Sequence, residues 1–127
     1  MISTVILVHA EFDIARGCKT LRAHIAAQNW KPTVGARATA AFTAMGDMIL
    51  NSTTDELVPI SMTITNTCEN ASIELGCSLY LPDINSPEMV DATQRLRRAT
   101  DELDVYETAG NVQVIARLCV KSKEANR

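Results

Sequence analysis

The sequence is poor in the features that mark membrane proteins and nucleic-acid-binding proteins. No apolar run among its 127 residues approaches the roughly 20 residues that a membrane-spanning helix needs. The formal net charge of −3 gives no electrostatic reason to expect nucleic acid, whose binding favours clustered Lys and Arg. The opening MISTVILVHAEF lacks the basic region of a signal peptide and favours a strand. We therefore expect a cytoplasmic protein that binds neither membranes nor nucleic acid.

Closely spaced metal-binding residues are also missing. Cys18, Cys68, Cys77 and Cys119 occur singly, without the CxxC pairs that zinc sites use. The patterns described below place Cys18 and Cys77 on apolar faces, where a free cysteine acts as a small hydrophobe. We expect reduced thiols and no metal site.

Three stretches have the periodicity of amphipathic helices. The first is expected from an N-cap at Asp13 to about Gln28, and the second from Pro32 to about Leu50. The third starts at Pro87, after an N-cap at Ser86. The residues expected on their buried sides are Ile14, Cys18, Leu21 and Ile25; Val34, Ala38, Ala41, Met45 and Met48 or Ile49; and Met89, Ala92, Leu96, Ala99 and Leu103.

Apolar and alternating runs predict five strands. They lie at about 3–8, 58–65, 73–81, 104–108 and 112–120, and the alternation points Ile60, Leu79, Val114 and Leu118 towards the helices. The resulting order is β-α-α-β-β-α-β-β. Strands with one polar face imply a two-layer α/β (α+β) sandwich, in which three helices cover one face of a mixed sheet. We expect a single domain over residues 1–121 and a frayed tail over 122–127.

Both ends of the chain resemble a known family. STVILVHAEFDIARGCKTLRAHIAAQNW and TQRLRRATDELDVYETAGNVQVIARLCV resemble the opening and closing segments of the RsbT-type switch kinases, a branch of the GHKL (histidine kinase-like) ATPase superfamily. The resemblance implies a histidine kinase-like ATPase fold, and the family's element order agrees with the order read from the residues.

The middle of the chain departs from that family's pattern. Where the family carries a Glu and a Mg²⁺-ligating Asn on the second helix, this chain has Ala44 and Met48. The segment LYLPDINSP lacks the family's glycines, whose exposed backbone N–H groups hold phosphates. The third helix follows too closely for an ATP lid. We therefore expect no catalytic residue and no cofactor; if a nucleotide does bind, Asn51 and Asp83 are the residues to test.

The leading hypothesis is a non-catalytic, RsbT-like regulatory protein (a pseudo-ATPase) that acts by protein–protein contact in partner switching. The resemblance implies a partner of the sulfate-transporter-like antagonist, phosphatase or sigma-factor type, and a homodimer is left open. One alternative is a divergent ATP-dependent serine/threonine kinase or anti-sigma factor. Another is a small-ligand sensor that reuses the vacated nucleotide pocket. Arg95, Arg97 and Arg98 on the third helix could face an acidic partner or simply solvent.

Overall fold

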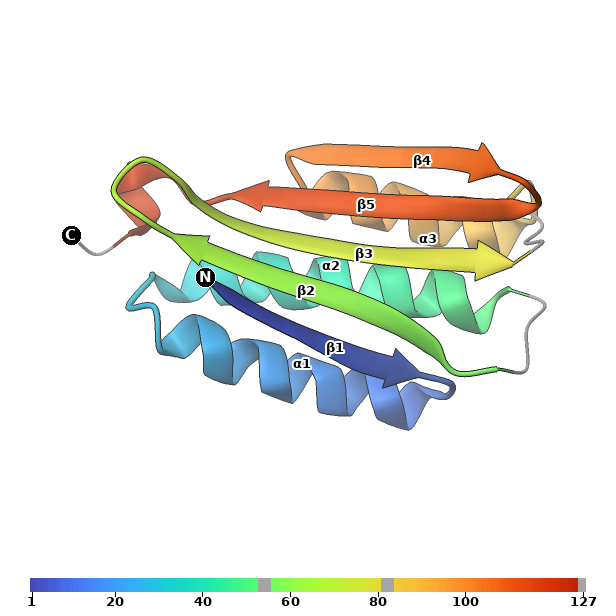
Figure 1. The fold of residues 1–127 in the computed structure, drawn as a ribbon, viewed down its shortest axis with the longest axis horizontal. Coiled ribbons are helices and arrows are strands. Elements are labelled where there is room, and N and C mark those ends of the chain that lie inside the picture. The colour runs from blue at the N-terminus through green and yellow to red at the C-terminus, as the bar shows by residue number, and fades with distance from the viewer. Residues whose placement is uncertain (53–55, 81–83, 126–127) are drawn as a thin grey trace.

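The chain folds into one sheet and one layer of helices (Figure 1). The computed structural model describes residues 1–52, 56–80 and 84–125. The predicted order of elements is confirmed. The elements are β1 (Ile2–Val8), α1 (Glu11–Ala26), α2 (Pro32–Leu50), β2 (Val58–Asn66), β3 (Ala71–Tyr80), α3 (Pro87–Ala99), β4 (Glu102–Thr108), β5 (Asn111–Cys119) and the short 3-10 helix η1 (Ser122–Glu124).

The sheet has the strand order β1-β2-β3-β5-β4, and every neighbouring pair is antiparallel. The expected mixed sheet is therefore wrong in this detail. Two helices connect β1 to β2, so the chain returns to the end of the sheet where β1 stopped, and β2 runs back along it. The single helix α3 does give β4 the direction of β3, but β5 lies between them and opposes both (Figure 1).

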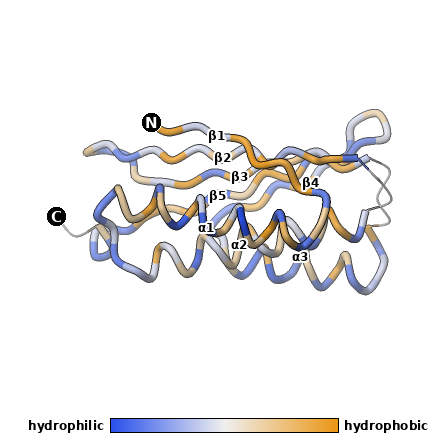
Figure 2. The backbone as a smooth tube through the Cα atoms, turned by 90° about the horizontal axis from the view of Figure 1, so that it is seen from below, coloured by the Kyte–Doolittle hydropathy of each residue, from blue (hydrophilic) through white to orange (hydrophobic). Residues whose placement is uncertain are grey.

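All three helices cover the same face of this sheet (Figure 2). The register places Ile60, Leu79, Val114 and Leu118 in the core, each no more than 1% exposed. This confirms the predicted inner face. A slip of one residue would have turned every one of these side chains to the opposite side.

Helix α2 lies between α1 and α3, and contacts both. Close approach of α1 and α2 depends on two glycines, each facing a large side chain of the other helix. A Cβ on Gly17 would lie 2.5 Å from Cε1 of the fully buried Phe42. A Cβ on Gly46 would lie 2.6 Å from Cγ1 of Ile14. The two helices therefore interlock in both directions.

Two predicted helix boundaries need correction. Helix α1 begins at Glu11, before Asp13, whose carboxylate accepts hydrogen bonds from the backbone N–H groups of His9 and Ala10 at 2.9 and 3.1 Å. These bonds lower the pKa of Asp13. Helix α3 ends at Ala99, so Leu103 belongs to β4 and packs on the core from there.

The expected frayed tail is ordered over residues 122–125. Glu124 and Ala125 are buried, and the backbone N–H of Lys31 donates to the carbonyl of Glu124 at 2.7 Å. Arg37 donates to the Glu124 carboxylate at 3.3 Å, and so does the hydroxyl of Thr33. The short helix η1 is therefore tied to the start of α2, which sequence periodicity alone could not indicate. Residues 126–127 lie outside the described part of the chain.

The interlock predicts opposite outcomes for the same substitution at two helical glycines. Gly17→Ala should lower the free energy of unfolding by about 1 kcal/mol or more, because displacing the Phe42 ring outweighs the gain in helix propensity. Gly35→Ala is the control. The nearest heavy atom to its Cβ would be Cγ2 of Ile25 at 4.0 Å, so this variant should be stabilised by about 0.5 kcal/mol or more. Urea denaturation measures both values; a stabilised Gly17→Ala would contradict the interlock.

The central position of α2 predicts strong sensitivity at Met45, which is completely buried. Met45→Asp should prevent folding, because it leaves a carboxylate without a partner in the core. Arg97→Ala, on the exposed side of α3, should change the free energy of unfolding by less than about 0.5 kcal/mol. Circular dichroism and thermal melts distinguish the two variants, and similar melting temperatures would show that the helix phases are wrong.

Candidate functional site

The first candidate site is the face of α2 where the resemblance places the acid and the magnesium ligand. Ala44 is fully buried and Met48 is 2% exposed. The hydroxyl of Thr93 on α3 lies 4.0 Å from the sulfur of Met48, so α3 packs directly on this face. Neither side chain can act as an acid or base or bind a hard cation.

The described residues between β3 and α3 lead directly into the start of α3. Ile84 to Ser86 are a turn, and the hydroxyl of Ser86 accepts a hydrogen bond from the backbone N–H of Met89 at 3.2 Å. Pro87 takes the first helical position, where a missing N–H is tolerated. The predicted N-cap is therefore confirmed. The described part of this stretch is a helix start, with no lid.

Of the two fallback nucleotide residues, Asn51 lies within the described structure. Asn51 is the C-cap of α2, and its side-chain amide donates to the carbonyl of Asp47 at 2.8 Å. Asp83 lies outside the described residues. The carboxylate of Asp47 is also engaged, 2.8 Å from a guanidinium nitrogen of Arg95. Asp91 holds the same guanidinium at 2.9 Å, and the two carboxylates raise the pKa of Arg95.

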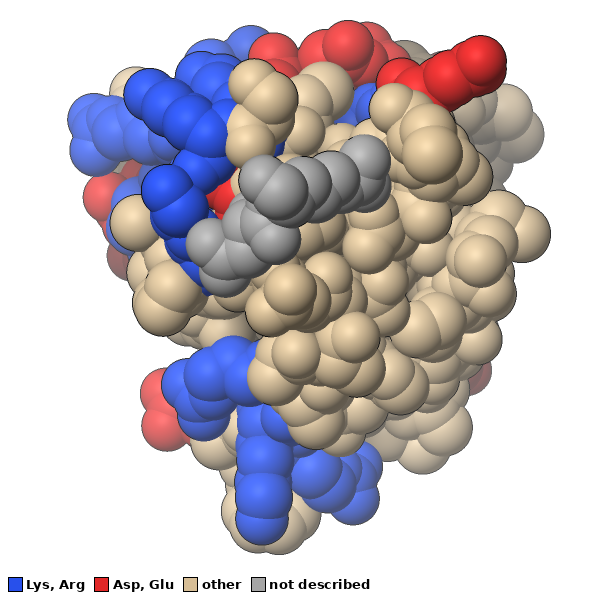
Figure 3. Space-filling view, turned by 90° about the vertical axis from the view of Figure 1, so that its left-hand side faces the viewer, with Lys and Arg blue, Asp and Glu red and all other residues tan. Residues whose placement is uncertain are grey.

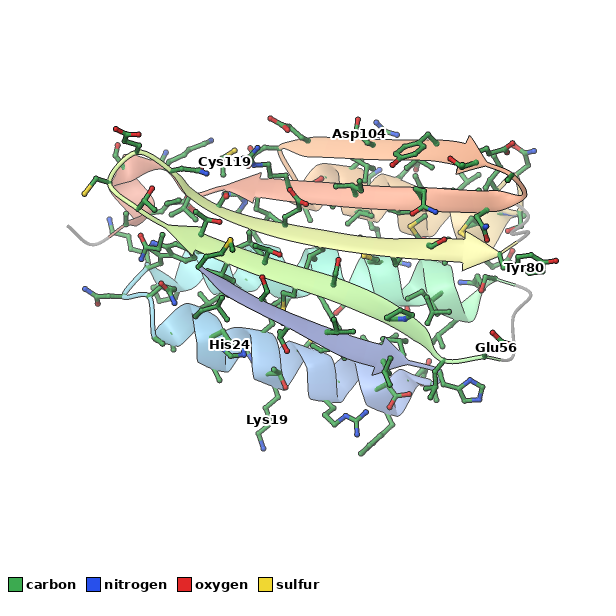
Figure 4. All side chains as sticks on the ribbon, viewed as in Figure 1. Lys19, His24, Glu56, Tyr80, Asp104 and Cys119 are labelled. Carbon is green, nitrogen blue, oxygen red and sulfur yellow. The ribbon has the colours of Figure 1, made fainter. Side chains whose placement is uncertain are left out.

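The thiols and histidines provide no constellation for catalysis in the part of the chain that the structure describes. Cys18 and Cys77 are buried, as expected, and burial raises the pKa of Cys77 to about 12, which keeps it protonated. Cys68 is exposed and Cys119 is half-buried on β5. His24 and Lys19 lie on α1, with Lys19 pointing away from the sheet (Figure 4). Among described residues, no cluster of three His, Cys, Asp or Glu could hold a metal ion.

The second candidate site is a groove on the outer side of the helix layer. Its central hollow, of about 610 Å³, has a floor from α2 made of Ala36, Thr39, Ala40 and Thr43. Helix α1 contributes Cys18 and Arg22 to one rim, and α3 contributes Arg95, Arg98 and Ala99 to the other. We call this central hollow and its two neighbours the helix-layer groove.

The neighbouring hollows extend the helix-layer groove along α2. One, of about 600 Å³, shares Arg22, Ala36 and Thr39 with the centre and reaches Trp30 and Lys31. The other, of about 300 Å³, shares Cys18 and Thr43 and ends at Glu11 and Asp47. The groove therefore runs along most of α2.

The sequence reasoning missed this groove, although its signal is visible. Ala38 and Ala41 were expected on the buried side of α2, and both are buried. Ala36 and Ala40 are exposed on the opposite side. Small residues at 36, 39, 40 and 43 repeat at helical spacing and form a second stripe. Periodicity could have identified that stripe, but not the arginines that α1 and α3 place beside it.

Asp101 lies near one end of this helix layer and holds three segments together. Its carboxylate accepts hydrogen bonds from the backbone N–H of Cys119 at 2.7 Å and from Arg37 at 2.9 Å. The bond from Cys119 is the main cause of a lowered pKa, and Arg37 adds to it.

No family model matches the sequence, and no curated protein sequence matches it. Among solved structures, the chain is similar to the RsbU and RsbW domains of Rv1364c from Mycobacterium tuberculosis, with a TM-score of 0.71 at 9% sequence identity. The match covers 93% of this chain and 32% of that one, so this chain spans about a third of its length. The comparison shows that the two proteins share a fold. No helix in the described ranges is both long enough and apolar enough to cross a membrane.

The lowered pKa of Asp101 predicts a pH-dependent contribution to stability. Because the folded-state pKa lies below the ordinary value of 3.8, the stabilisation is complete above about pH 5 and is lost as the pH falls through the folded-state pKa. Asp101→Asn should therefore lower the free energy of unfolding at pH 7 by about 1 kcal/mol, a value reduced for partial solvent exposure. The difference from wild type should shrink in acid.

Urea denaturation at pH 7 and at pH 3 measures this difference. Asp104→Asn is a matched control, because Asp104 is exposed on β4 (Figure 4). A variant of Asp101 that is as stable as wild type at pH 7, or a difference that grows in acid, would contradict the assignment.

Proposed function

We propose that this protein is a non-catalytic regulator that acts by protein–protein contact in partner-switching signalling in the cytoplasm. One observation carries the proposal: Ala44 and Met48 are buried on the face of α2 where the resemblance places the acid and the metal ligand, and α3 contacts Met48 through Thr93. Likeness to a chain containing RsbU and RsbW domains supports this kind of signalling. The expected partner is a sulfate-transporter-like antagonist, a phosphatase or a sigma factor.

Phosphoryl transfer depends on positioned phosphates and on a metal ion that neutralises their charge. The described residues at this face offer a methyl group and a thioether in place of those ligands. Ser86 already uses its hydroxyl to cap α3, and Pro87 has no N–H to offer a phosphate. These features favour a pseudo-ATPase over a divergent kinase. They also disfavour a ligand sensor at the same place, because α3 occupies the face that such a ligand would need.

The proposal predicts that Mg-ATP does not bind. A ligand present at a hundredfold excess over its Kd stabilises the folded state by about 2.7 kcal/mol, which would raise the melting temperature of a domain of this size by several degrees. Differential scanning fluorimetry with millimolar Mg-ATP should show no shift beyond that of salt at equal ionic strength. A saturable, Mg²⁺-dependent shift would instead favour the kinase, and Asn51→Ala and Asp83→Ala would then locate the site.

A second measurement tests the regulatory role directly. Purified candidates of the three partner types, from the same organism, are titrated against the protein by calorimetry without nucleotide. Binding of one of them, with no phosphate transferred from labelled ATP, is the expected result. Transfer of phosphate to a serine of the partner would contradict the hypothesis that the protein is non-catalytic.

A further inference from the structure

The helix-layer groove carries unpaired positive charge at its centre. Its central lining contains three arginines and no acidic residue, although the whole chain has a net charge of −3. Arg95 is neutralised by Asp47 and Asp91. Arg22 on α1 and Arg98 on α3 are exposed, and within the described residues neither makes an ion pair. In Figure 3, lysines and arginines gather in two groups on one side of the molecule.

The floor of the groove is unsuited to a small anion. The hydroxyl of Thr39 already donates to the carbonyl of Gly35 at 2.9 Å, and that of Thr43 lies 3.4 Å from the sulfur of Cys18. Backbone N–H groups along the side of a helix are used within it. A phosphate would therefore meet only arginine side chains on opposite rims, with alanine methyl groups below.

The same floor suits a helix. Residues 36, 39, 40 and 43 form a stripe of small side chains, so the axis of a packed helix can come close to α2. At 19 residues, α2 is about 28 Å long, which matches a partner helix of similar length. A helix lying in the groove would present its two flanks to Arg22 and Arg98 at the same time.

We propose that the helix-layer groove docks an amphipathic helix of a protein partner, with small or apolar residues facing Ala36 and Ala40 and carboxylates on both flanks facing Arg22 and Arg98. This rests on the proposed function, because it names the surface by which the regulator holds its partner. The ends of the groove set the direction of the bound helix. Lys31 favours an acidic end, and Glu11 at the far end favours a basic one.

The test uses a synthetic probe. A fluorescein-labelled, alanine-based helix of about 18 residues carries a stripe of Ala and Leu with glutamates on both flanks, and a second peptide has Gln in place of every Glu. Fluorescence anisotropy measures the Kd of each peptide for the wild-type protein and its variants. The wild type should bind the Glu peptide at least about tenfold more tightly than the Gln peptide, and added salt should weaken the binding.

Three variants locate the binding. The double variant Arg22→Glu/Arg98→Glu should bind the Glu peptide about tenfold or more weakly than the wild type does. It should also gain affinity for a matching Lys peptide. Ala40→Gln places a longer side chain on the floor without changing charge, and should also weaken it. Arg97→Glu is the control on the same helix, because Arg97 is exposed but does not line the groove; its effect should stay within about twofold. Thermal melts confirm that all of these exposed substitutions leave the fold intact.

The assignment is overturned by equal binding of the Glu and Gln peptides, by no binding of either, or by an equal effect of Arg97→Glu. It is also overturned if phosphatidylserine vesicles or RNA bind through Arg22 and Arg98 while the peptide does not. Thermal melts of the same samples with Mg-ATP test the proposed function separately. If the Glu peptide does not bind and Mg-ATP does not raise the melting temperature, only the groove assignment is wrong. If Mg-ATP raises the melting temperature and the Glu peptide binds as expected, the non-catalytic hypothesis is wrong and the groove assignment stands.

Discussion

The interlock between α1 and α2 is the constraint on which the rest of the structure depends. Gly17 receives the ring of Phe42, and Gly46 receives the side chain of Ile14. Because each helix provides both a large side chain and a gap, their separation and relative rotation are fixed together. That rotation turns Met45 into the core and leaves Ala40 at the outer surface. The packing of α1 on α2 therefore determines both the buried face of α2 and the floor of the groove.

Strand directions follow from the number of helices in each connection. The paired helices between β1 and β2 return the chain antiparallel, and the single helix α3 would place β4 parallel to β3. The insertion of β5 between them, joined to β4 by the Ala109–Gly110 turn, keeps every pair antiparallel. A positive φ at both turn residues, 49° and 86°, matches the twist of a tight hairpin.

Alternation and helical spacing were sufficient to predict the strands, the inner face of the sheet and the buried sides of the helices. These patterns are local, since each reflects which side of one element meets the core. They could not predict that β5 inserts beside β3, or that Glu124 packs against Arg37 and Thr33. Nor could they predict the groove, because Arg22 lies on α1 and Arg98 on α3, and α2 lies between these helices. Features that join distant segments depend on tertiary geometry, which the sequence pattern of one element does not contain.

Helix α3 takes part in both candidate sites. Helix α3 begins at Pro87, after its N-cap Ser86. It lies against α2, where Thr93 meets Met48 and Arg95 meets Asp47. Because α3 packs on Met48, which is 2% exposed, this face of α2 is buried. Helix α3 also brings Arg98 to the rim of the groove. A displacement of α3 away from α2 would therefore break the Asp47–Arg95 ion pair and separate the two rims of the groove. The same packing of α3 on α2 thus buries Met48 and sets the width of the groove.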